Sequence, residues 1–394
     1  MIAALALVLG SCTEGDKFDP NKDVLVMTGT DNSPLIKFAV EQTPAVYPVT
    51  VSCTGKVSED VTVNVKIDNS LVEKYNKENK TSYYAIEDSW ASLEKNSVVI
   101  SKGKAASEAS NLTINENAEF VDGRIYMIPV TITDVKGGIE VLETSRTVYI
   151  RISRVYYFPA LDISNKNVYA NFIFDEPISL TTHTLEVKFY AYSWHQEGSS
   201  EPISRMLGLY NKDEQGYLYR IGENGYKINQ LQLNISNVGP IGSSTLFSTG
   251  NWYTLSVTYD GSTTRLYVDG VRDAELSGGA PIEFQRVELG MSWGGYGNKQ
   301  RYDGRIAEIR VWDRALSASE IQLGLCGVDP ASEGLKAYWK MNEGEGHIFY
   351  DSVGENHMDW SNVWRDSNED GPLENYDYSQ YVTWTNDDKN KCVN

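Results

Sequence analysis

The sequence predicts an all-β protein with two sandwich domains. Short runs rich in β-branched and aromatic residues recur along most of the 394 residues, and turns that contain Gly, Pro or Asn separate them. Within these runs apolar and polar residues alternate, which is the period of a strand with one buried face. Only two short segments, residues 70–80 and 318–325, show a helical pattern. These observations favour an all-β fold over helical and mixed folds.

The clearest strand pattern lies in residues 250–271. Leu255 and Val257 alternate with polar residues, as expected for a half-buried antiparallel strand. Asp260-Gly261 follows as a turn dipeptide, because Gly accepts the positive φ that a twisted hairpin requires. This stretch is therefore predicted to be a meander within a larger antiparallel sheet.

Length and charge limit the possible partners. A chain of this length is expected to form about two or three domains. Acidic residues outnumber basic residues 54 to 35, so the formal net charge is −19. A negative field repels phosphate backbones, and nucleic acid is therefore not an expected partner.

The N-terminus has the pattern of a lipoprotein signal. Its first nine residues are apolar, and the segment ends Leu9-Gly10-Ser11-Cys12. It resembles a bacterial lipoprotein signal peptide, which implies lipidation of Cys12, and it is too short to span a bilayer. Residues 1–23 are thus expected to be a signal peptide and polar tether, with a chance apolar start as the alternative. A lipid anchor would place the protein at the outer membrane or cell surface, with no other membrane contact.

Residues 24–154 are expected to form the first domain. About seven predicted strands in about 130 residues suggest a β-sandwich of the immunoglobulin type. One helix interrupts them at residues 70–80, where Ser70 can serve as the N-cap.

Part of this first domain resembles a known module. The strings LVEKYNKENKTSYYAIEDSW, SVVISKGK and YMIPVTIT are similar to the N-terminal module of unknown function in Bacteroidetes surface lipoproteins. In that group the module precedes glycan-binding modules or endo-β-N-acetylglucosaminidase-type catalytic domains. The resemblance implies that the first domain is a spacer.

Three further strings characterise the second domain, residues 157–394: WYTLSVTYDG, YDGRIAEIRVWDRALSASEI and AYWKMNEGEGHIFYDSVGENH. They resemble the laminin-G-like, concanavalin A-like jelly-roll family, which implies a concanavalin A-like jelly-roll sandwich. In the commonest members the third segment comes first, and here it comes last, as a circular permutation would produce. Ser317 and Glu320 predict a capping box before the short helix.

The residues give little support for catalysis. Glucanases of this fold place two carboxylates on one strand as E-x-D-x-x-E or E-x-D-x-E, because residues i and i+4 share a face. The nearest string is EIRVWD, residues 308–313, and Arg310 occupies a position that requires a carboxylate. Four histidines lack metal-ligand spacing: His183, His195, His347 and His357. A glycoside hydrolase stays open as the alternative function.

Carbohydrate binding is better supported, by two predicted loops. Sugars stack their C–H faces on aromatic rings and pair their hydroxyls with polar side chains, and exposed loop aromatics favour binding. The loops are YAYSWHQEGSSE and MSWGGYGNKQRY. The expected ligand contacts are Tyr192, Trp194 and His195 in the first loop and Trp293, Tyr296, Asn298 and Arg301 in the second. The alternative is that these aromatics form packing cores of the loops.

One acidic segment matches the start of a calcium loop. The segment DSNEDG has the D-x-N-x-D-G pattern, and an Asp follows at the twelfth position. The expected structural calcium ligands are Asp366, Asn368, Asp370 and Asp377. By resemblance to the jelly-roll family, Asp351 is a further candidate. An acidic surface loop without metal is the alternative.

The cysteines after the signal are odd in number, so they cannot all pair within the chain. Cys326 and Cys392 both lie in the second half and are a candidate disulfide in an exported protein, with buried free thiols as the alternative. Cys53 is expected to be a small core residue.

The sequence therefore predicts a lipid-anchored, exported protein that binds an oligosaccharide or polysaccharide through its jelly-roll domain without cleaving it. Two alternatives stay open: a glycoside hydrolase of concanavalin A-like fold, and a structural or protein-binding surface component.

Overall fold

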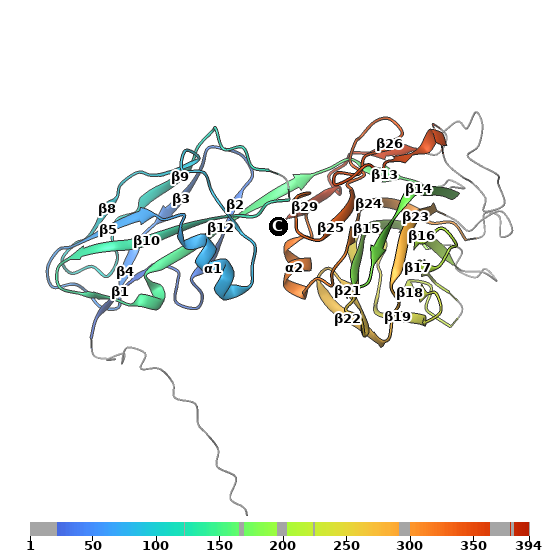
Figure 1. The fold of residues 1–394 in the computed structure, drawn as a ribbon. Coiled ribbons are helices and arrows are strands. Elements are labelled where there is room, and N and C mark those ends of the chain that lie inside the picture. Colours follow the sequence, from blue (N-terminus) through green and yellow to red (C-terminus); the bar gives the residue numbers. More distant parts are fainter. Residues whose placement is uncertain are drawn as a thin grey trace, which may run out of the picture. The chain divides into compact units, whose positions relative to one another are not determined.

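A computed structural model shows an all-β protein in which two α-helices accompany the strands of the described residues (Figure 1). The structure describes residues 22–121, 123–164, 169–194, 203–223, 225–290, 300–362, 379 and 382–393. Across these ranges, none of the helices has the length and apolar character needed to cross a bilayer.

The chain divides into two compact units. The first comprises residues 1–74, 84–119 and 126–152, and the second comprises residues 75–83, 120–125 and 153–394. The division after Ile152 lies close to the expected domain boundary, but the sequence did not indicate that two short earlier segments belong to the second unit.

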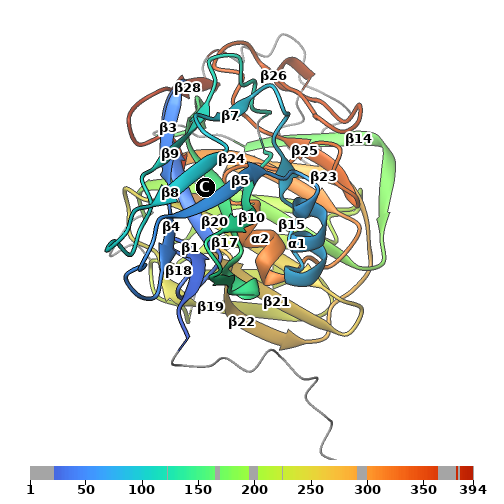
Figure 2. The same cartoon turned by 90° about the vertical axis from the view of Figure 1, so that its left-hand side faces the viewer.

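The first unit is a β-sandwich. Its strands are β1 (Val24–Met27), β2 (Leu35–Val40), β3 (Ala45–Val49), β4 (Val51–Cys53), β5 (Val61–Ile67), β6 (Tyr84–Ala85), β7 (Ala91–Leu93), β8 (Ser97–Ile100), β9 (Ser110–Ile114), β10 (Tyr126–Lys136), β11 (Glu140–Val141) and the start of β12 (Thr147–Tyr157). The main sheet runs β2-β12-β10-β5-β8, and two smaller sheets run β11-β1-β4 and β3-β9-β7 (Figures 1 and 2).

Alternation decides which face of these strands is buried. In β5, Val61, Val63 and Val65 are each at most 2% exposed, whereas the residues between them are half-buried. Helix α1 (Leu71–Asn79) begins one residue after Ser70, the predicted cap, whose hydroxyl donates instead to the carboxylate of Asp68 at 2.6 Å.

The second unit is built on two large sheets. Its strands are β13 (Ala160–Asp162), β14 (Tyr169–Leu180), β15 (His183–Ser193), β16 (Ser204–Tyr210), β17 (Gly216–Ile221), β18 (Gln230–Ile235), β19 (Gly239–Leu246), β20 (Trp252–Tyr259), β21 (Thr263–Val268), β22 (Val271–Ser277), β23 (Ile282–Gly290), β24 (Asp303–Trp312), β25 (Leu335–Trp339), β26 (Ile348–Phe349), β27 (Met358–Asp359), β28 (Thr383–Thr385) and β29 (Lys391–Val393). An eight-stranded sheet runs β22-β21-β20-β15-β24-β13-β28 with β25 beside β24, and a six-stranded sheet runs β14-β23-β16-β17-β18-β19.

The apolar core of this unit takes one face from each sheet. Leu255 and Val257 of β20 and Leu209 and Val287 of the six-stranded sheet are all 0% exposed and belong to one cluster. The predicted meander is present, because β20, β21 and β22 are neighbours in the sheet and Gly261 has a φ of +97° in the first turn. The second sandwich therefore has two outer faces, one on each sheet, and polar side chains on these faces are available for other roles.

The short helix α2 (Ala318–Leu323) has the predicted capping box. Ser317 accepts a hydrogen bond from the backbone N–H of Glu320, and the Glu320 side chain accepts one from the backbone of Ser317. Ile321 and Leu316 pack with Trp312 of β24. The helix thus covers part of the outer face of the eight-stranded sheet.

Candidate functional site

Several strands of the eight-stranded sheet begin or end at the same edge of the second sandwich. The end of β15 meets the start of β24, because Ser193 pairs with Asp303. The end of β13 lies beside them, since Asp162 pairs with Arg305 of β24 and, on its other side, with Thr383 at the start of β28. The connections that leave these strands therefore depart from one end of the sheet.

The six-stranded sheet has a matching edge. Tyr169 at the start of β14 pairs with Gly290 at the end of β23, and Leu207 near the start of β16 pairs with Leu289. The β13–β14, β15–β16 and β23–β24 connections thus all cross between the sheets at the same end, which we call the loop end. Both sequence-predicted binding loops belong to these connections, and the acidic segment precedes β28, which starts there.

Most of the predicted contacts at this end lie outside the described residues: His195, Trp293, Tyr296, Asn298, Asp366, Asn368, Asp370 and Asp377. The lipidation residue Cys12 also lies outside them. Tyr192, Trp194 and Arg301 are described, and they have different environments.

Tyr192 is held by a network of charged residues. Its hydroxyl donates to the Asp162 carboxylate at 2.8 Å and accepts from Arg305 Nε at 2.6 Å. Arg305 also donates to both oxygens of Asp387, at 2.9 and 2.6 Å. Burial and the hydrogen bond to Asp162 raise the pKa of Tyr192 to about 12. The hydroxyl is fully engaged, so the ring, in a side chain that is 38% exposed, is the part of Tyr192 that a ligand can contact.

Trp194 and Arg301 have different surroundings: one packs against the core, and the other has a hydrogen-bond donor that is unpaired within the described ranges. Trp194 is half-buried against the apolar core, which is the packing role that the sequence left open. Arg301 is half-buried, and its Nε has no hydrogen-bond partner in the part of the chain that is described. Arg301 Nε is therefore a buried donor without a partner among the described residues.

The outer face of the six-stranded sheet carries a buried polar group close to the loop end. Glu288 of β23 accepts hydrogen bonds from Arg205 at 2.7 Å and from Arg286 at 2.6 Å, one at each carboxylate oxygen. Arg286 also pairs with Glu214 at 3.0 Å. Asn171 of β14 lies directly opposite Glu288 in the strand register. We call these five residues the polar row.

The sequence analysis did not identify the polar row. Alternation within β14 places Ala170 and Phe172 in the core and therefore Asn171 on the opposite face. The pairing of β14 with β23, which brings Asn171 beside Glu288, depends on long-range register that periodicity does not reveal.

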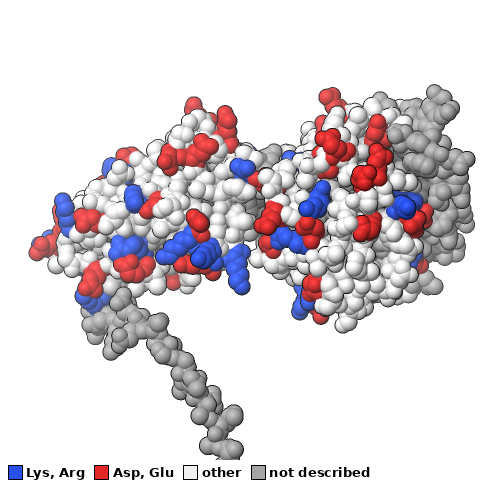
Figure 3. Space-filling model, viewed as in Figure 1, with Lys and Arg blue, Asp and Glu red and all other residues white. Residues whose placement is uncertain are grey.

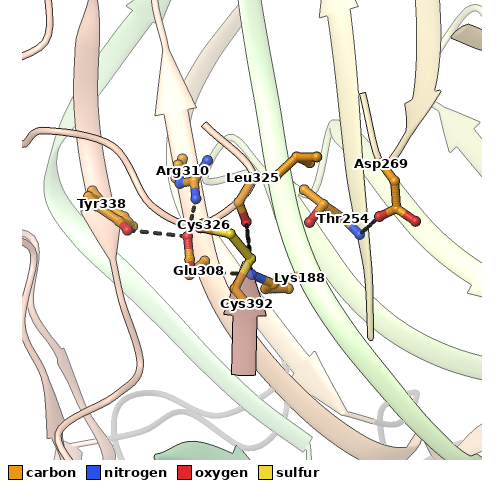
Figure 4. The surroundings of a disulfide bond; sticks show 9 residues. All are labelled: Lys188, Thr254, Asp269, Glu308, Arg310, Leu325, Cys326, Tyr338 and Cys392. Atoms are coloured by element: carbon orange, nitrogen blue, oxygen red, sulfur yellow. Dashed lines mark hydrogen bonds and ion pairs between the residues drawn. A yellow bond between two sulfur atoms is a disulfide. The ribbon is translucent and has the colours of Figure 1, made fainter. Parts of the chain in front are cut away.

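A second group of buried charges lies on the outer face of the eight-stranded sheet (Figure 4). Arg310 of β24 donates to Glu186 of β15 at 3.2 Å and to Glu308, and Lys188 lies 3.6 Å from Glu308. The indole N–H of Trp312 donates to Glu186 at 3.0 Å. We call Glu186, Lys188, Glu308 and Arg310 the ion-pair cluster.

The disulfide between Cys326 and Cys392 lies next to this cluster (Figure 4). The two Cα atoms are 5.4 Å apart, and Lys188 Nζ donates to the carbonyl of Leu325 at 2.8 Å. Cys326 and Cys392 thus form the disulfide that the sequence suggested, and Cys53 is a buried free thiol. The disulfide holds strand β29 and the segment after α2 together at the cluster.

The ion-pair cluster contains two carboxylates but lacks the properties of a glycosidase acid pair. Burial alone would raise the pKa of Glu308, but the nearby Lys188 and Arg310 outweigh it and lower that pKa. Arg310 is bonded to both carboxylates, Glu308 and Glu186. Glu308 is therefore held ionised and cannot be the proton donor that a retaining or inverting mechanism requires.

Asp351, the calcium candidate from the resemblance, accepts hydrogen bonds from backbone groups of its own turn and of β25. One carboxylate oxygen accepts the backbone N–H groups of Tyr338 and Val353 at 2.9 and 3.0 Å, and the other has no partner among the described residues. Over the same described ranges, no three His, Cys, Asp or Glu side chains are grouped so that they could hold a metal ion.

Two family models match the chain. One, for an N-terminal domain, matches residues 20–139. The other, described as the concanavalin A-like lectin/glucanases superfamily, matches residues 173–322. No curated protein matches the sequence.

Solved structures give further likenesses. A protein of Bacteroides ovatus to which carbohydrate binding is ascribed is 21% identical, with a TM-score of 0.57, and the match covers 89% of this chain and 99% of that one. A heptameric pentraxin of Limulus polyphemus is 14% identical, with a TM-score of 0.36 over 52% of this chain and 95% of that chain. Bacteroides thetaiotamicron EndoBT-3987 is 19% identical, with a TM-score of 0.28 over 33% of this chain and 30% of that chain. With its two packed sheets and the family match, the second unit contains a domain of the concanavalin A-like lectin/glucanases superfamily.

Proposed function

We propose that the second unit binds carbohydrate non-covalently at its loop end. The observation that carries the proposal is the convergence of three crossing connections there, two of which contain the aromatic and polar residues expected for sugar contacts. The fold and the function ascribed to the Bacteroides ovatus protein support it. Because proteins of the same fold can have different functions, the proposal depends on the residues at the loop end.

The described side chains at this end suit a sugar. The Tyr192 ring is fixed by Asp162 and Arg305 and offers an aromatic face for C–H stacking. Arg301 Nε supplies a donor for a hydroxyl. Trp293, Tyr296, Asn298 and His195 are proposed to add stacking and hydrogen bonds from the same connections. Individual contacts of this kind are weak, and a high density of copies on a membrane would raise the avidity.

An acidic protein is better suited to neutral than to anionic glycans. The net charge is −19, and on the face shown in Figure 3 the basic side chains are scattered among acidic ones. Nucleic acids and highly sulfated polysaccharides are therefore poor ligands.

The proposal is tested by incubating the purified protein with a panel of host glycans and plant polysaccharides while measuring both retention and new reducing ends. We expect retention without new reducing ends. New reducing ends would show a glycoside hydrolase, and capture of a surface protein with no glycan retained would favour the protein-binding alternative.

Variants locate the site within the second unit. Trp293→Ala and Trp194→Ala are expected to weaken glycan retention, while Tyr47→Ala, a half-buried aromatic of the first unit, should leave it unchanged. Wild-type retention in both tryptophan variants would remove these loops from the site.

We also propose a lipid anchor at Cys12 that displays the protein at the outer membrane or cell surface. The apolar segment before Cys12 supports it. Metabolic labelling with a radioactive fatty acid should label the wild-type protein and not Cys12→Ser, and equal labelling of both would contradict the anchor.

A structural calcium ion is the remaining proposal, with Asp366, Asn368, Asp370 and Asp377 as ligands. A ligand that binds only the folded state stabilises it by about 2.7 kcal/mol at 100 times its Kd. Calcium should therefore raise the melting temperature, and Asp366→Ala combined with Asp370→Ala should abolish the increase. An equal increase in the double variant would exclude this loop.

A further inference from the structure

The Asn171 side chain differs from every other member of the polar row. It is 0% exposed, and neither its amide nitrogen nor its amide oxygen has a hydrogen-bond partner in the described part of the protein. Buried polar groups are nearly always paired, because an unpaired one forfeits its bonds to water. An amide that is buried and unpaired on an outer sheet face therefore calls for a partner that the described residues do not supply.

The position of Asn171 links it to the loop end. It follows Tyr169 by two residues, and Tyr169 pairs with Gly290, where the second predicted binding loop begins. Directly opposite residues on paired strands share a face, so Asn171 and Glu288 point to the same side of the sheet. Asn171 therefore lies on the outer face of the sheet, two residues along β14 from the loop end.

The charged members of the polar row pair with one another. Arg205 and Arg286 each donate to Glu288, and Arg286 also pairs with Glu214. Two cations thus face two anions, and the carboxylate nearest in register would repel an anionic group. The site suits an uncharged ligand whose groups both donate and accept hydrogen bonds.

We infer that Asn171 is a ligand contact that reads the hydroxyl groups of a neutral glycan at the loop-end edge of the six-stranded sheet. A side-chain amide offers two donors and one acceptor oxygen, which matches adjacent sugar hydroxyls. The inference rests on the proposed function and narrows the ligand class from carbohydrate in general to uncharged sugars.

The test replaces Asn171 with an apolar residue of similar size. Asn171→Leu should bind the retained neutral glycan about tenfold more weakly, the loss expected for about one good hydrogen bond, measured by calorimetry with the full-length protein. Its melting temperature should stay unchanged or rise, because the substitution removes an unpaired buried amide. Binding of the wild type should change little between 50 and 500 mM salt, since a neutral ligand has no charge to screen.

Asn234→Leu is the matched control. Asn234 lies on the outer face of the same sheet in β18, four strand steps or about 19 Å from β14. This variant should bind as the wild type does.

The outcomes separate the two proposals. If wild type retains no glycan, the proposed function fails, and this ligand assignment fails with it. If wild type and Asn171→Leu bind equally, only the role of Asn171 is overturned. A clearly lowered melting temperature in Asn171→Leu would show that the amide already has a partner in the folded protein. An equal loss of glycan affinity in Asn171→Leu and Asn234→Leu would show an effect that is not specific to Asn171. Either result overturns the inference.

Discussion

The two sheets of the second unit bury polar side chains on their outer faces in different ways. On the eight-stranded sheet, Arg310 bonds to Glu186 and Glu308, and Lys188 reaches a backbone carbonyl, beside a disulfide. On the six-stranded sheet, Asn171 lies beside an equally buried carboxylate and yet has no partner among the described residues.

This difference suggests that the two groups have different roles, one in the stability of the fold and the other in ligand binding. A buried charge that is paired with opposite charges of the same chain, as Arg310 is, leaves those charges uncompensated when it is removed. A buried amide with unused hydrogen-bonding capacity lowers stability, and we infer that a ligand supplies the missing partner. The ion-pair cluster is therefore expected to be structural, and the polar row is expected to border the binding site.

Arg310→Met should show the largest effect. It leaves Glu186 and Glu308 buried without their common cation, and removal of one member of a buried ion pair costs about 3–5 kcal/mol. Urea unfolding followed by tryptophan fluorescence measures it, because eight of the nine Trp residues lie after residue 153.

Arg272→Met is the control for Arg310→Met. Arg272 pairs with Glu275 at 3.4 Å, and both side chains are about half exposed or more, so the loss should be below about 1 kcal/mol. Equal losses in the two variants would contradict the structural role of the cluster. Trp312→Phe, which removes the donor to Glu186 and replaces a buried ring by a smaller one, provides a milder probe if Arg310→Met does not fold.

Replacing both Cys326 and Cys392 by Ser should lower the free energy of unfolding nearly as much as Arg310→Met does. The disulfide joins residues 66 apart in sequence, and closing a loop of that length stabilises the folded state by about 4 kcal/mol in the chain-entropy model, with about 2–4 typical. Glycan retention by the folded variant should be unchanged, since the disulfide lies beside the ion-pair cluster. Loss of retention in a folded variant would place that cluster in the site.

His183 gives a pH-dependent effect inside the sandwich. Burial lowers its pKa to about 4, and its Nε2 lies 2.7 Å from the Tyr217 hydroxyl. In the unfolded chain the pKa is about 6.5. As the pH falls from about 6.5 to 4, His183 binds a proton in the unfolded state but not in the folded state. The free energy of unfolding therefore falls with decreasing pH.

His183→Gln tests this effect. Between pH 7 and pH 4.5 the wild type should lose about 2–3 kcal/mol more than the variant. Parallel pH profiles for the two proteins would show that His183 takes up its proton at the same pH in the folded and unfolded states, which would contradict the lowered pKa.

Ser317→Ala should have the smallest effect. It removes half of the capping box of α2, a change that typically costs about 1 kcal/mol. Because α2 covers the eight-stranded sheet, thermal unfolding should shift slightly while glycan affinity stays the same. A change in affinity without a change in stability would be the opposite of this expectation.

The local parts of the fold were predictable from the sequence. The meander of β20 to β22 and the capping box of α2 depend on residues close in sequence, and both are present. The alternation in YPVTVSC, residues 47–53, predicts one strand. The structure divides this run at Thr50 into β3 and β4, which belong to different sheets. Periodicity could not show this, because a strand that changes sheets keeps its alternation.

The candidate site was predictable only in part. Aromatic and Gly-rich composition identified the loops that hold Tyr192 and Arg301. Composition could not show that the Tyr192 hydroxyl is used by Asp162 and Arg305, which are 30 and 113 residues away. Arg310 in EIRVWD was the one residue of the buried ion-pair cluster that the sequence singled out, and the structure bonds it to Glu186 and Glu308.

The most direct test of the account compares Asn171→Leu with Trp312→Phe, measuring for each the melting temperature and the Kd for the retained neutral glycan. We predict that Asn171→Leu keeps its melting temperature and loses about tenfold in affinity, whereas Trp312→Phe loses stability and binds as the wild type does. The reverse pattern, with affinity lost in Trp312→Phe and unchanged in Asn171→Leu, would contradict it.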